Sequence, residues 1–250
     1  MRTCRFRKDG RERYGVVEGA EVRALGAEPW AGGLPEGPRF ALSEVTLLAP
    51  AAPSKVVAVG RNYGAHAREL GQDVPPEPLL FLKPSTALIG PMEEIRLPEQ
   101  SREVHHEAEL ACVVGRVLTR VGAAEARRGI FGYTCLDDVT ARDIQRAEGH
   151  FTRSKSFDTF CPLGPVVETD LDPTDQVVIC RVNGEERQRG FTRDMVFDPF
   201  ALVAFISQVM TLLPGDVVTT GTPAGVGPLR RGDWVEVEVS GIGVLKNPVT

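Results

Sequence analysis

The stretch from Val104 to Gln145 constrains the fold and the chemistry of this chain more than any other. It begins V-H-H-E-A-E-L-A-C-V-V-G and ends F-G-Y-T-C-L-D-D-V-T-A-R-D-I-Q. Residues 104–114 largely alternate and are rich in β-forming side chains, which predicts one strand. Because successive side chains point to opposite faces of a strand, Glu107 and Glu109 would lie on one face, roughly 7 Å apart. Two buried carboxylates so close repel each other unless a positive charge lies between them.

A second β-like run, residues 130–136, ends in another carboxylate pair, Asp137 and Asp138. Converging carboxylates without a zinc-type Cys or His pattern are typical of a site for Mg²⁺, Mn²⁺ or Ca²⁺. In the alternative interpretation, Glu107 and Glu109 lie on a solvated edge strand and pair with Lys or Arg. Alternation alone does not choose between Asp137 and Asp138.

The composition of the 250-residue chain is that of a soluble globular protein, with 42% hydrophobic and 25% charged residues. Its net charge of −5 argues against a nucleic-acid surface. The five cysteines are scattered and form no CxxC pair, which predicts buried free thiols in a reducing cytosol. No secretory h-region and no apolar run as long as a membrane span is present, so we expect a cytoplasmic protein without a membrane partner.

The first part of the chain predicts a small separate unit. Three short strand candidates are joined by turn signals at Asp9-Gly10 and Glu18-Gly19, which predicts a β meander. A run rich in proline and alanine near residue 50 would lead into the main domain. We therefore predict an α+β, β-rich fold, with a small N-terminal β domain at 1–48 and a main domain at 49–250.

Three polar side chains near the start of the main domain admit two interpretations each. In a helix over 64–70, His66 and Glu69 would be neighbours, either as a base oriented by a carboxylate or as an exposed pair of no consequence. Lys83 follows a short strand and is either an anion contact or a solvated lysine.

The second half of the chain carries clear local signals. Asn183-Gly184 predicts a two-residue β-hairpin. Asp198 and Pro199 predict the start of a helix that would run to about Leu213. The glycine-rich segment 221–227 matches neither a Walker A loop nor a dinucleotide fingerprint. It is either a small-anion loop or a tight turn.

Several of these segments together resemble the fumarylacetoacetate hydrolase family, over about Val56 to the C-terminus. Any one of the motifs is weak, but six in the family's order are specific for the family and not for one substrate. The motifs are G-R-N-Y-x-x-H-x-x-E (60–69), F-L-K-P-S-T (81–86), H-E-A-E-L (106–110), D-V-T-A-R-D-I-Q (138–145), K-S-F-D (155–158) and T-G-T-P-x-G-V-G (220–227).

The resemblance implies a mixed β-roll with peripheral helices, usually a homodimer, and a role for each motif. It implies Mg²⁺ or Mn²⁺, with Ca²⁺ as a third candidate, on three carboxylates, and a catalytic pair assisted by a lysine. It also implies contacts to the substrate's carboxylate and oxo groups, and two further candidates for anion contacts. The implied metal ligands are Glu107, Glu109 and Asp138. The implied catalytic residues are His66, Glu69 and Lys155. The implied substrate contacts are Gln145 and Thr222, and the two further candidates for anion contacts are Arg61 and Lys83.

The implied activity is that of a metal-dependent enzyme acting on a small 2-oxo (di)carboxylic acid through a metal-bound enolate. We expect an isomerase/decarboxylase of aromatic catabolism. An acylpyruvate or fumarylpyruvate C–C hydrolase and an oxaloacetate decarboxylase are the alternatives. A non-catalytic Ca²⁺-binding β domain would explain the carboxylates but predicts no role for His66, Lys155 or Gln145. A divalent-metal phosphohydrolase would explain the carboxylates and the glycine-rich segment, but the resemblance does not support phosphate release.

Overall fold

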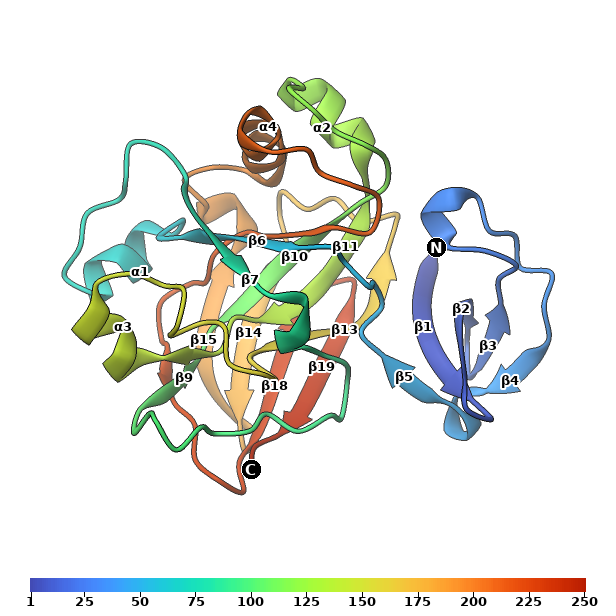
Figure 1. Cartoon of the computed structure of the whole chain (residues 1–250), viewed down its shortest axis with the longest axis horizontal. Helices are drawn as coiled ribbons and strands as arrows, with labels where there is room; N and C mark the ends of the chain where they lie inside the picture. The colour runs from blue at the N-terminus through green and yellow to red at the C-terminus, as the bar shows by residue number, and fades with distance from the viewer.

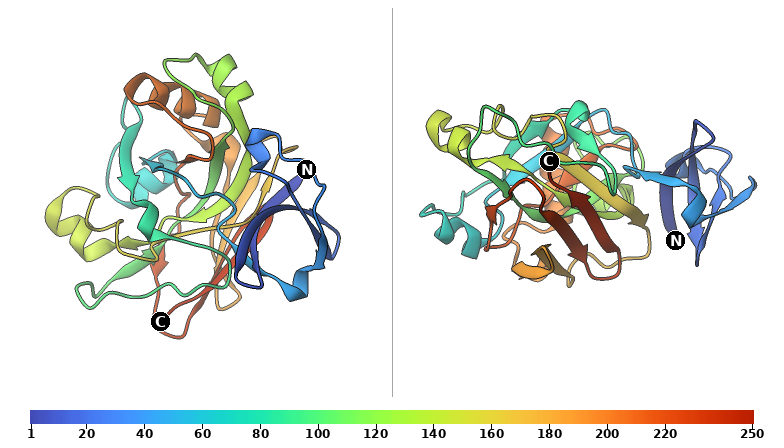
Figure 2. Two further views of the ribbon diagram at one scale, coloured as in Figure 1. Left: turned by 45° about the vertical axis from the view of Figure 1, so that its right-hand side comes forward. Right: turned by 90° about the horizontal axis from the view of Figure 1, so that it is seen from below.

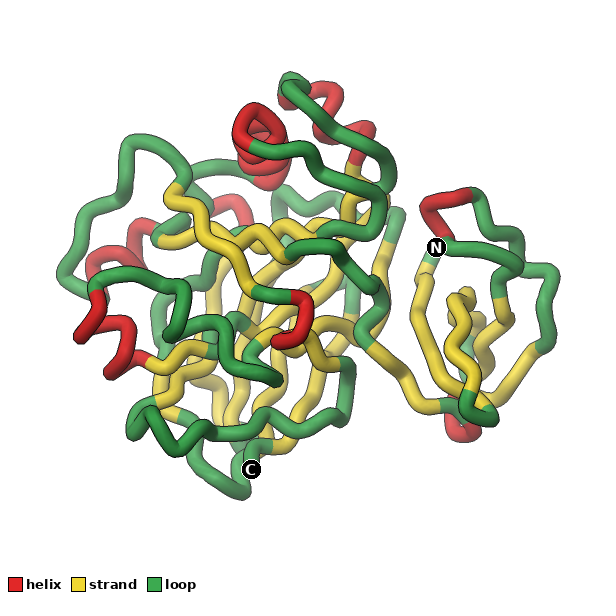
Figure 3. Tube along the Cα trace, viewed as in Figure 1, coloured by secondary structure: helices red, strands yellow, loops and turns green.

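The computed structural model describes all 250 residues. It is an α+β structure dominated by strands, as expected from the sequence, with few and short helices (Figures 1 and 3). A small lobe built from the N-terminal strands stands beside a larger body that holds the rest of the chain (Figure 2). No helix combines the length and the apolar character needed to cross a bilayer.

The small lobe contains the predicted meander and two further strands. Its strands are β1 (Arg2–Lys8), β2 (Arg11–Glu18), β3 (Glu21–Ala24), β4 (Arg39–Ala41) and β5 (Thr46–Leu48). The lobe is not isolated from the body, because β1 pairs with β13 through Arg2–Glu168 and Thr3–Val167. We propose the boundary at residues 48 and 49 as the division between a small N-terminal domain and the domain that carries the site.

The body contains one long sheet shared with the small lobe, a four-stranded sheet and a three-stranded sheet. The long sheet runs β4-β3-β2-β1-β13-β11-β10-β16-β6-β7, with β5 beside β1 and β8 beside β13. The other two sheets run β15-β14-β18-β19 and β12-β9-β17. The strands of the body are β6 (Val56–Gly60), β7 (Leu79–Lys83), β8 (Leu88–Ile89), β9 (Val104–His106), β10 (Ala108–Val114), β11 (Ile130–Asp137), β12 (Thr140–Ala141), β13 (Cys161–Glu168), β14 (Val177–Val182), β15 (Glu185–Phe191), β16 (Val217–Thr219), β17 (Gly227–Pro228), β18 (Trp234–Val239) and β19 (Gly243–Pro248).

Strand β10 lies at the centre of the core and has apolar side chains on both faces. Leu110 and Cys112 belong to the larger apolar cluster, which includes β14 and β18 of the four-stranded sheet. Ala111 and Val113 belong to a second cluster on the opposite face, together with Leu163. The alternation predicted from the sequence is therefore present in β10, and Glu109 lies on the face of Ala111 and Val113.

The single strand predicted over residues 104–114 is wrong. The chain forms β9 and β10, which belong to different sheets, and Glu107 lies at the break between them. Strand β9 pairs with β12 and β17, whereas β10 pairs with β11 and β16. These competing partners, which are distant in sequence, explain the break.

The helices lie at the periphery of the body. They are α1 (Gly64–Glu69), α2 (Ala123–Gly129), α3 (Arg142–Glu148) and α4 (Pro199–Val209). Helices α1 and α3 lie on the side of the body away from the small lobe, and α2 and α4 lie together at its top in Figure 1. The N-terminal signal of α4 is confirmed, because the Asp198 carboxylate accepts hydrogen bonds from the amides of Phe200 and Ala201.

Two local predictions had different outcomes. Helix α4 ends at Val209, four residues before the expected end at Leu213. The reason is that Leu212 exchanges backbone hydrogen bonds with Leu118, which withdraws this segment from the helix. The hairpin at Asn183-Gly184 is confirmed; both residues have positive φ angles, 54° and 81°, as a type I′ turn requires.

Asp216 joins three segments at the start of β16. One carboxylate oxygen accepts from the amides of Ser54 and Lys55 and from the Ser54 hydroxyl. The other accepts from the Leu213 amide and pairs with the Lys55 ammonium. Burial raises the pKa of Asp216, but the hydrogen bonds from Lys55, Ser54 and Leu213 outweigh it and lower the pKa below 3.8.

We expect Asp216→Asn to destabilise the fold by about 3 kcal/mol at pH 7, because an amide cannot accept all these bonds and leaves Lys55 unpaired. A carboxyl group whose pKa is lower in the folded state stabilises the protein at pH values above its unfolded-state pKa. This contribution is lost as the pH falls. Urea unfolding of both proteins at pH 7 and near pH 3 measures the effect. A deficit that stays constant over this range would contradict the ionic role of Asp216.

Candidate metal centre and cavity

Three carboxylates converge where β10 and β11 end. Strand β10 pairs antiparallel with β11, with Ala108 opposite Asp137, so Asp138 lies beside Glu107. The Asp138 amide donates to the Glu107 carbonyl oxygen at 2.9 Å. Carboxylate oxygens of Glu107, Glu109 and Asp138 all lie within 4.8 Å of one another, and all three residues are buried.

Asp137 has a different position from its neighbour. One of its oxygens accepts from the Glu107 amide at 2.8 Å, and the other is buried without a hydrogen-bond partner. Burial raises the pKa of Asp137 to about 7, against the effect of that hydrogen bond. The geometry thus groups Asp138 with the two glutamates, and Asp137 holds the backbone between β9 and β10.

Two buried lysines pair with the triad. The Lys155 ammonium lies 2.8 Å from Glu107 Oε2 and 2.5 Å from Asp138 Oδ2. The Lys83 ammonium lies 2.5 Å from Asp138 Oδ1 and 3.2 Å from the Val139 carbonyl oxygen. Lys83 is only 1% exposed, so the interpretation as a solvated lysine is wrong. The triad is not on a solvated edge strand either.

Arg142 is a site residue that was not predicted from the sequence. Its guanidinium pairs with Glu107 through Nη2 and donates from Nη1 to Gln145 Oε1 at 2.5 Å. Its Nε is buried without a partner. Arg142 belongs to the D-V-T-A-R-D-I-Q motif, and the i, i+3 spacing on α3 puts it on the same face as Gln145. That spacing was the signal that could have identified it.

The two glutamates experience opposite electrostatic environments. Burial alone would raise the pKa of Glu107, but Lys155 and Arg142 outweigh it and hold the pKa well below its ordinary range. Burial, followed by the charges of Asp138 and Glu107, raises the pKa of Glu109 well above 4.5. Glu109 has no cation within ion-pair distance, and its only hydrogen-bond donor from the main chain is Gly221 N, at 2.8 Å.

The donor set fits a hard divalent cation. Oxygens that bind one Mg²⁺ at about 2.1 Å lie at most about 4 Å apart, so small side-chain rotations would close the observed spacing. Glu109 is a buried carboxylate that lacks a positive partner, and a cation in the triad would supply it. Carboxylate oxygens favour Mg²⁺, Mn²⁺ or Ca²⁺ over softer metals.

His66 and Glu69 form a hydrogen-bonded pair beside the triad, with His66 buried and the Glu69 side chain 33% exposed. His66 Nδ1 lies 3.0 Å from Glu69 Oε2, and the His66 side chain is only 5% exposed. The other Glu69 oxygen accepts from the Gly225 amide at 2.9 Å, which ties α1 to the glycine-rich segment. Because an ionised carboxylate only accepts, Nδ1 donates to Glu69, and Nε2 is the ring nitrogen left to act as a base. The interpretation as an exposed pair is wrong for His66, which is buried, whereas Glu69 is exposed.

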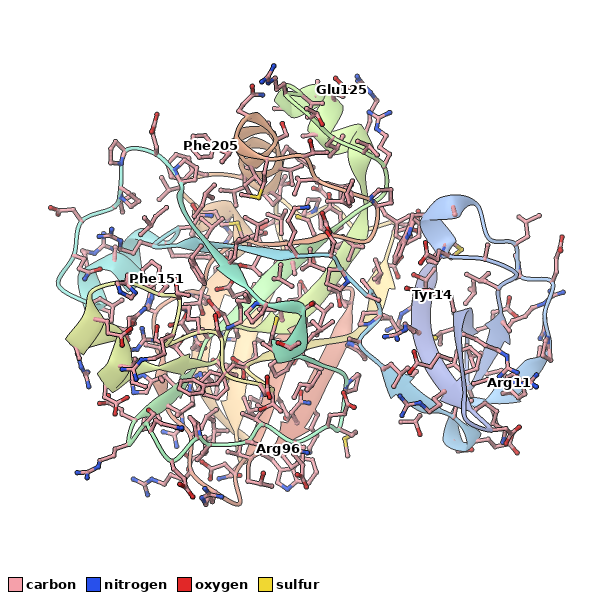
Figure 4. The ribbon with its side chains drawn as sticks, in the orientation of Figure 1. Arg11, Tyr14, Arg96, Glu125, Phe151 and Phe205 are labelled. Carbon is pink, nitrogen blue, oxygen red and sulfur yellow. The ribbon has the colours of Figure 1, made fainter.

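One cavity of about 720 Å³ brings these groups together. Its wall includes an aromatic pair, Phe81 and Phe151, with ring centroids 4.9 Å apart, and the Lys155 ammonium lies 5.0 Å from the Phe81 ring centroid. Phe151 lies on the side of the body that carries α1 and α3 (Figure 4). The polar groups that line the cavity are Arg61, His66, Gln72, Glu107, Glu109, Asp138, Arg142, Gln145, Arg146, His150, Thr152, Lys155 and Thr222.

Among the expected substrate contacts, three line this cavity and one does not. Gln145 and Thr222 line it, as does Arg61, whose backbone has a φ of 58° and whose Nε is buried without a partner. Lys83 lies behind Asp138 and does not line it. A second cavity of about 320 Å³ lies where the small lobe meets the body, and Arg5 and Arg7 there both pair with Glu12.

Comparison with known proteins supports the resemblance noted in the sequence. The family model described as fumarylacetoacetate (FAA) hydrolase C-terminal matches residues 55–250, and one described as Rv2993c-like, N-terminal, matches residues 1–50. The human protein named oxaloacetate tautomerase FAHD2A, mitochondrial, is 45% identical over 91% of this chain and 74% of its own length.

Two solved structures are similar over all of this chain and 99% of their own. One, titled 5-carboxymethyl-2-hydroxymuconate delta-isomerase from Mycobacterium smegmatis, is 46% identical with a TM-score of 0.94. The other, maleylpyruvate hydrolase from Sphingobium sp. SYK-6 in complex with manganese(II) and pyruvate, is 33% identical with a TM-score of 0.83. With its triad, its His66–Glu69 pair and these matches, the chain belongs to the fumarylacetoacetate hydrolase family.

Proposed function

We propose that this protein is a divalent-metal-dependent isomerase of small 2-oxo dicarboxylic acids in the breakdown of aromatic compounds. It would move a proton at the carbon beside the oxo group, with Mg²⁺ or Mn²⁺ as its metal. The observation that carries the proposal is that His66 and the three carboxylates line the same cavity. Relatives named as an oxaloacetate tautomerase and a muconate isomerase support this reaction type.

The carboxylates and the basic side chains have separate roles in this proposal. Glu107, Glu109 and Asp138 would hold the divalent cation, which acts as a Lewis acid on the 2-oxo acid when it is bound. Arg142 and Lys155 would bind the substrate's carboxylate and the oxygen on which negative charge develops. Both already lie against Glu107 at the cavity wall, so their charges are in place before a substrate enters.

His66 would transfer the proton. Glu69 holds Nδ1 and leaves Nε2 free to take a proton from the carbon beside the oxo group or to return it. The Gly225 amide holds the second Glu69 oxygen, which fixes the carboxylate and therefore the imidazole ring. Arg61, with a buried and unpartnered Nε in the same cavity, would receive the second carboxylate of a dicarboxylic substrate.

C–C bond hydrolysis of an acylpyruvate is the second candidate. One observation favours it: the cavity of about 720 Å³ has room for a water molecule beside His66 as well as a small substrate. In that reaction His66 would activate the water, and Arg142 and Lys155 would stabilise the enolate that leaves. The structural relative named maleylpyruvate hydrolase supports this candidate.

A turnover panel separates the two candidates. Enol-oxaloacetate, 2-hydroxyhepta-2,4-dienedioate, acetylpyruvate and fumarylpyruvate are offered to the purified protein with Mg²⁺ or Mn²⁺ and with EDTA. Metal-dependent ketonisation or double-bond migration without diketone cleavage supports the isomerase, with decarboxylation scored separately from released CO₂. Cleavage of the acylpyruvates supports the hydrolase. No metal-dependent turnover of any of the four compounds would contradict both.

His66→Ala is expected to lower kcat by about 10²- to 10⁴-fold, the range for removal of a general base. The Mn²⁺ dissociation constant should stay unchanged, because His66 does not belong to the triad. Steady-state kinetics and calorimetric Mn²⁺ titration measure the two quantities. His105→Ala is a suitable control, since His105 pairs with Glu103 and does not line the cavity. Full activity of the His66 variant would refute its role.

A further inference from the structure

Gln188 lies on β15 and is the buried polar side chain of a largely exposed strand. It is 1% exposed, whereas its neighbours Arg187 and Arg189 are exposed. A β-bulge at Arg187 interrupts the pairing of β15 with β14, where Cys180 faces Gln188 and Arg181 faces Glu186. Bulges often redirect a side chain near a functional site. Here the side chain after the bulge points toward the metal centre.

Every hydrogen-bonding position of the Gln188 amide is occupied. Its oxygen accepts from the Ala108 amide at 3.0 Å and lies 2.9 Å from His106 Nδ1. Its nitrogen donates to Thr222 Oγ1 at 2.7 Å and to the Pro223 carbonyl oxygen at 2.8 Å. Since a main-chain amide only donates and a carbonyl only accepts, these partners fix which end of the side chain is oxygen.

This network determines what Thr222 can offer to a ligand. Its hydroxyl donates to the Ala108 carbonyl oxygen at 2.8 Å and accepts from Gln188, so the hydroxyl proton is already committed. The main-chain N–H of Thr222 makes no hydrogen bond within the protein, and the residue lines the cavity. The donor that Thr222 has left for a substrate oxygen is therefore its amide.

The same strand supports the rest of the glycine-rich segment. Gly225 has a φ of 102°, and a Cβ there would lie 2.2 Å from the Arg187 carbonyl oxygen. A Cβ on Gly190 would lie 2.4 Å from the Pro223 ring. Pro223 and Gly225 thus pack directly on β15, and a side chain at Gly190 or Gly225 would force the two segments apart.

We propose that Gln188 is a positioning residue for the metal centre, a role that rests on the metal binding in the proposed function. Through Ala108 it holds the backbone between Glu107 and Glu109. Through Thr222 and Pro223 it holds the segment whose Gly221 amide binds Glu109. The carboxylate triad keeps its spacing because Gln188 joins β10 to the glycine-rich segment.

The experiment compares Gln188→Met with Cys180→Ala by Mn²⁺ titration, using calorimetry or electron paramagnetic resonance. Methionine fills the same space without hydrogen bonds. Cys180 is buried directly opposite Gln188 on β14, so its truncation also weakens the core but leaves the network intact. Unfolding midpoints of the metal-free proteins report the general loss of stability for both variants.

We expect Gln188→Met to weaken Mn²⁺ binding by about 10- to 100-fold, as for other residues that support metal ligands, and Cys180→Ala to leave it within about twofold. Thr222→Val breaks the network from its other end and should weaken Mn²⁺ binding similarly, whereas Thr222→Ser should not. The double variant Gln188→Met/Thr222→Val should be little worse than either single one, since both changes break one network.

Mn²⁺ binding by Gln188→Met and by Thr222→Val at wild-type affinity would overturn the proposal and leave Gln188 a structural residue only. If Gln188→Met does not fold, the Thr222 pair decides alone. A wild-type protein that binds Mn²⁺ but isomerises no 2-oxo acid would contradict the proposed function and not the role of Gln188. A wild-type protein that binds no Mn²⁺ would overturn both.

Discussion

Glu109→Gln is expected to abolish Mn²⁺ binding and to stabilise the metal-free protein at the same time. Loss of a metal ligand should weaken Mn²⁺ binding by more than the roughly 10- to 100-fold that follows loss of a residue supporting a ligand. The metal-free fold should gain about 1–3 kcal/mol at pH 8, because the substitution removes a buried charge that no cation pairs with. Burial and the charges of Asp138 and Glu107 raise the pKa of Glu109 well above 4.5, which has the same electrostatic cause.

The pH dependence of this gain has a defined sign. A carboxyl group whose folded-state pKa is raised favours folding below its unfolded pKa and loses that contribution as the pH rises. The stability difference between Glu109→Gln and the wild type should therefore grow from pH 4.5 to pH 8. Urea unfolding in EDTA measures it, and calorimetry measures the lost metal binding. A variant that is less stable than the metal-free wild type at pH 8 would contradict the unpaired buried charge assigned to Glu109.

Glu107→Gln makes the same chemical change two residues away and is expected to have the opposite effect on stability. Glu107 pairs with Arg142 and Lys155, both buried. Breaking a buried ion pair from one side costs about 3–5 kcal/mol, so this variant should lose stability as well as Mn²⁺ binding. Together the two variants separate ligation, which both abolish, from stability, which they change in opposite directions.

The deficit of Glu107→Gln should depend on pH in the opposite sense. Although burial opposes them, Lys155 and Arg142 lower the pKa of Glu107. A lowered folded-state pKa stabilises the protein above the unfolded pKa of about 4.5, and the contribution is lost as the pH falls. Unfolding in EDTA at pH 7 and near pH 3.5 should show the deficit shrinking. Equal stabilities of the two variants at pH 7 would contradict the assigned pairing.

The sequence predicted those parts of the fold that depend on neighbouring residues. The hairpin at Asn183-Gly184 and the start of α4 at Asp198 are fixed by local backbone chemistry, and both are confirmed. The break at Glu107 and the early end of α4 are fixed by pairing with segments far along the chain, namely β12, β17 and Leu118. Such competition leaves no local trace, so the periodic pattern continued through both places.

The residues of the candidate site likewise fall into those that the sequence indicated and those that it did not. The resemblance singled out the triad, the His66 pair and Lys155. The structure brings the triad, His66 and Lys155 to one cavity, and Glu69 contacts His66. The resemblance did not single out Arg142, although that residue lies inside a motif. Gln188 gave no signal at all, because E-E-R-Q-R-G-F reads as a polar edge strand, and only its contacts with Ala108 and Thr222 reveal its role.

A metal centre that works together with His66 is tested most directly by the ketonisation of enol-oxaloacetate, followed by stopped-flow absorbance with Mg²⁺ or Mn²⁺. We expect wild-type protein to accelerate the loss of enol absorbance well beyond metal alone, and EDTA, Glu109→Gln and His66→Ala each to remove the acceleration. His66→Ala should do so while still binding Mn²⁺. An acceleration that survives EDTA or either substitution would contradict a metal centre that works together with His66.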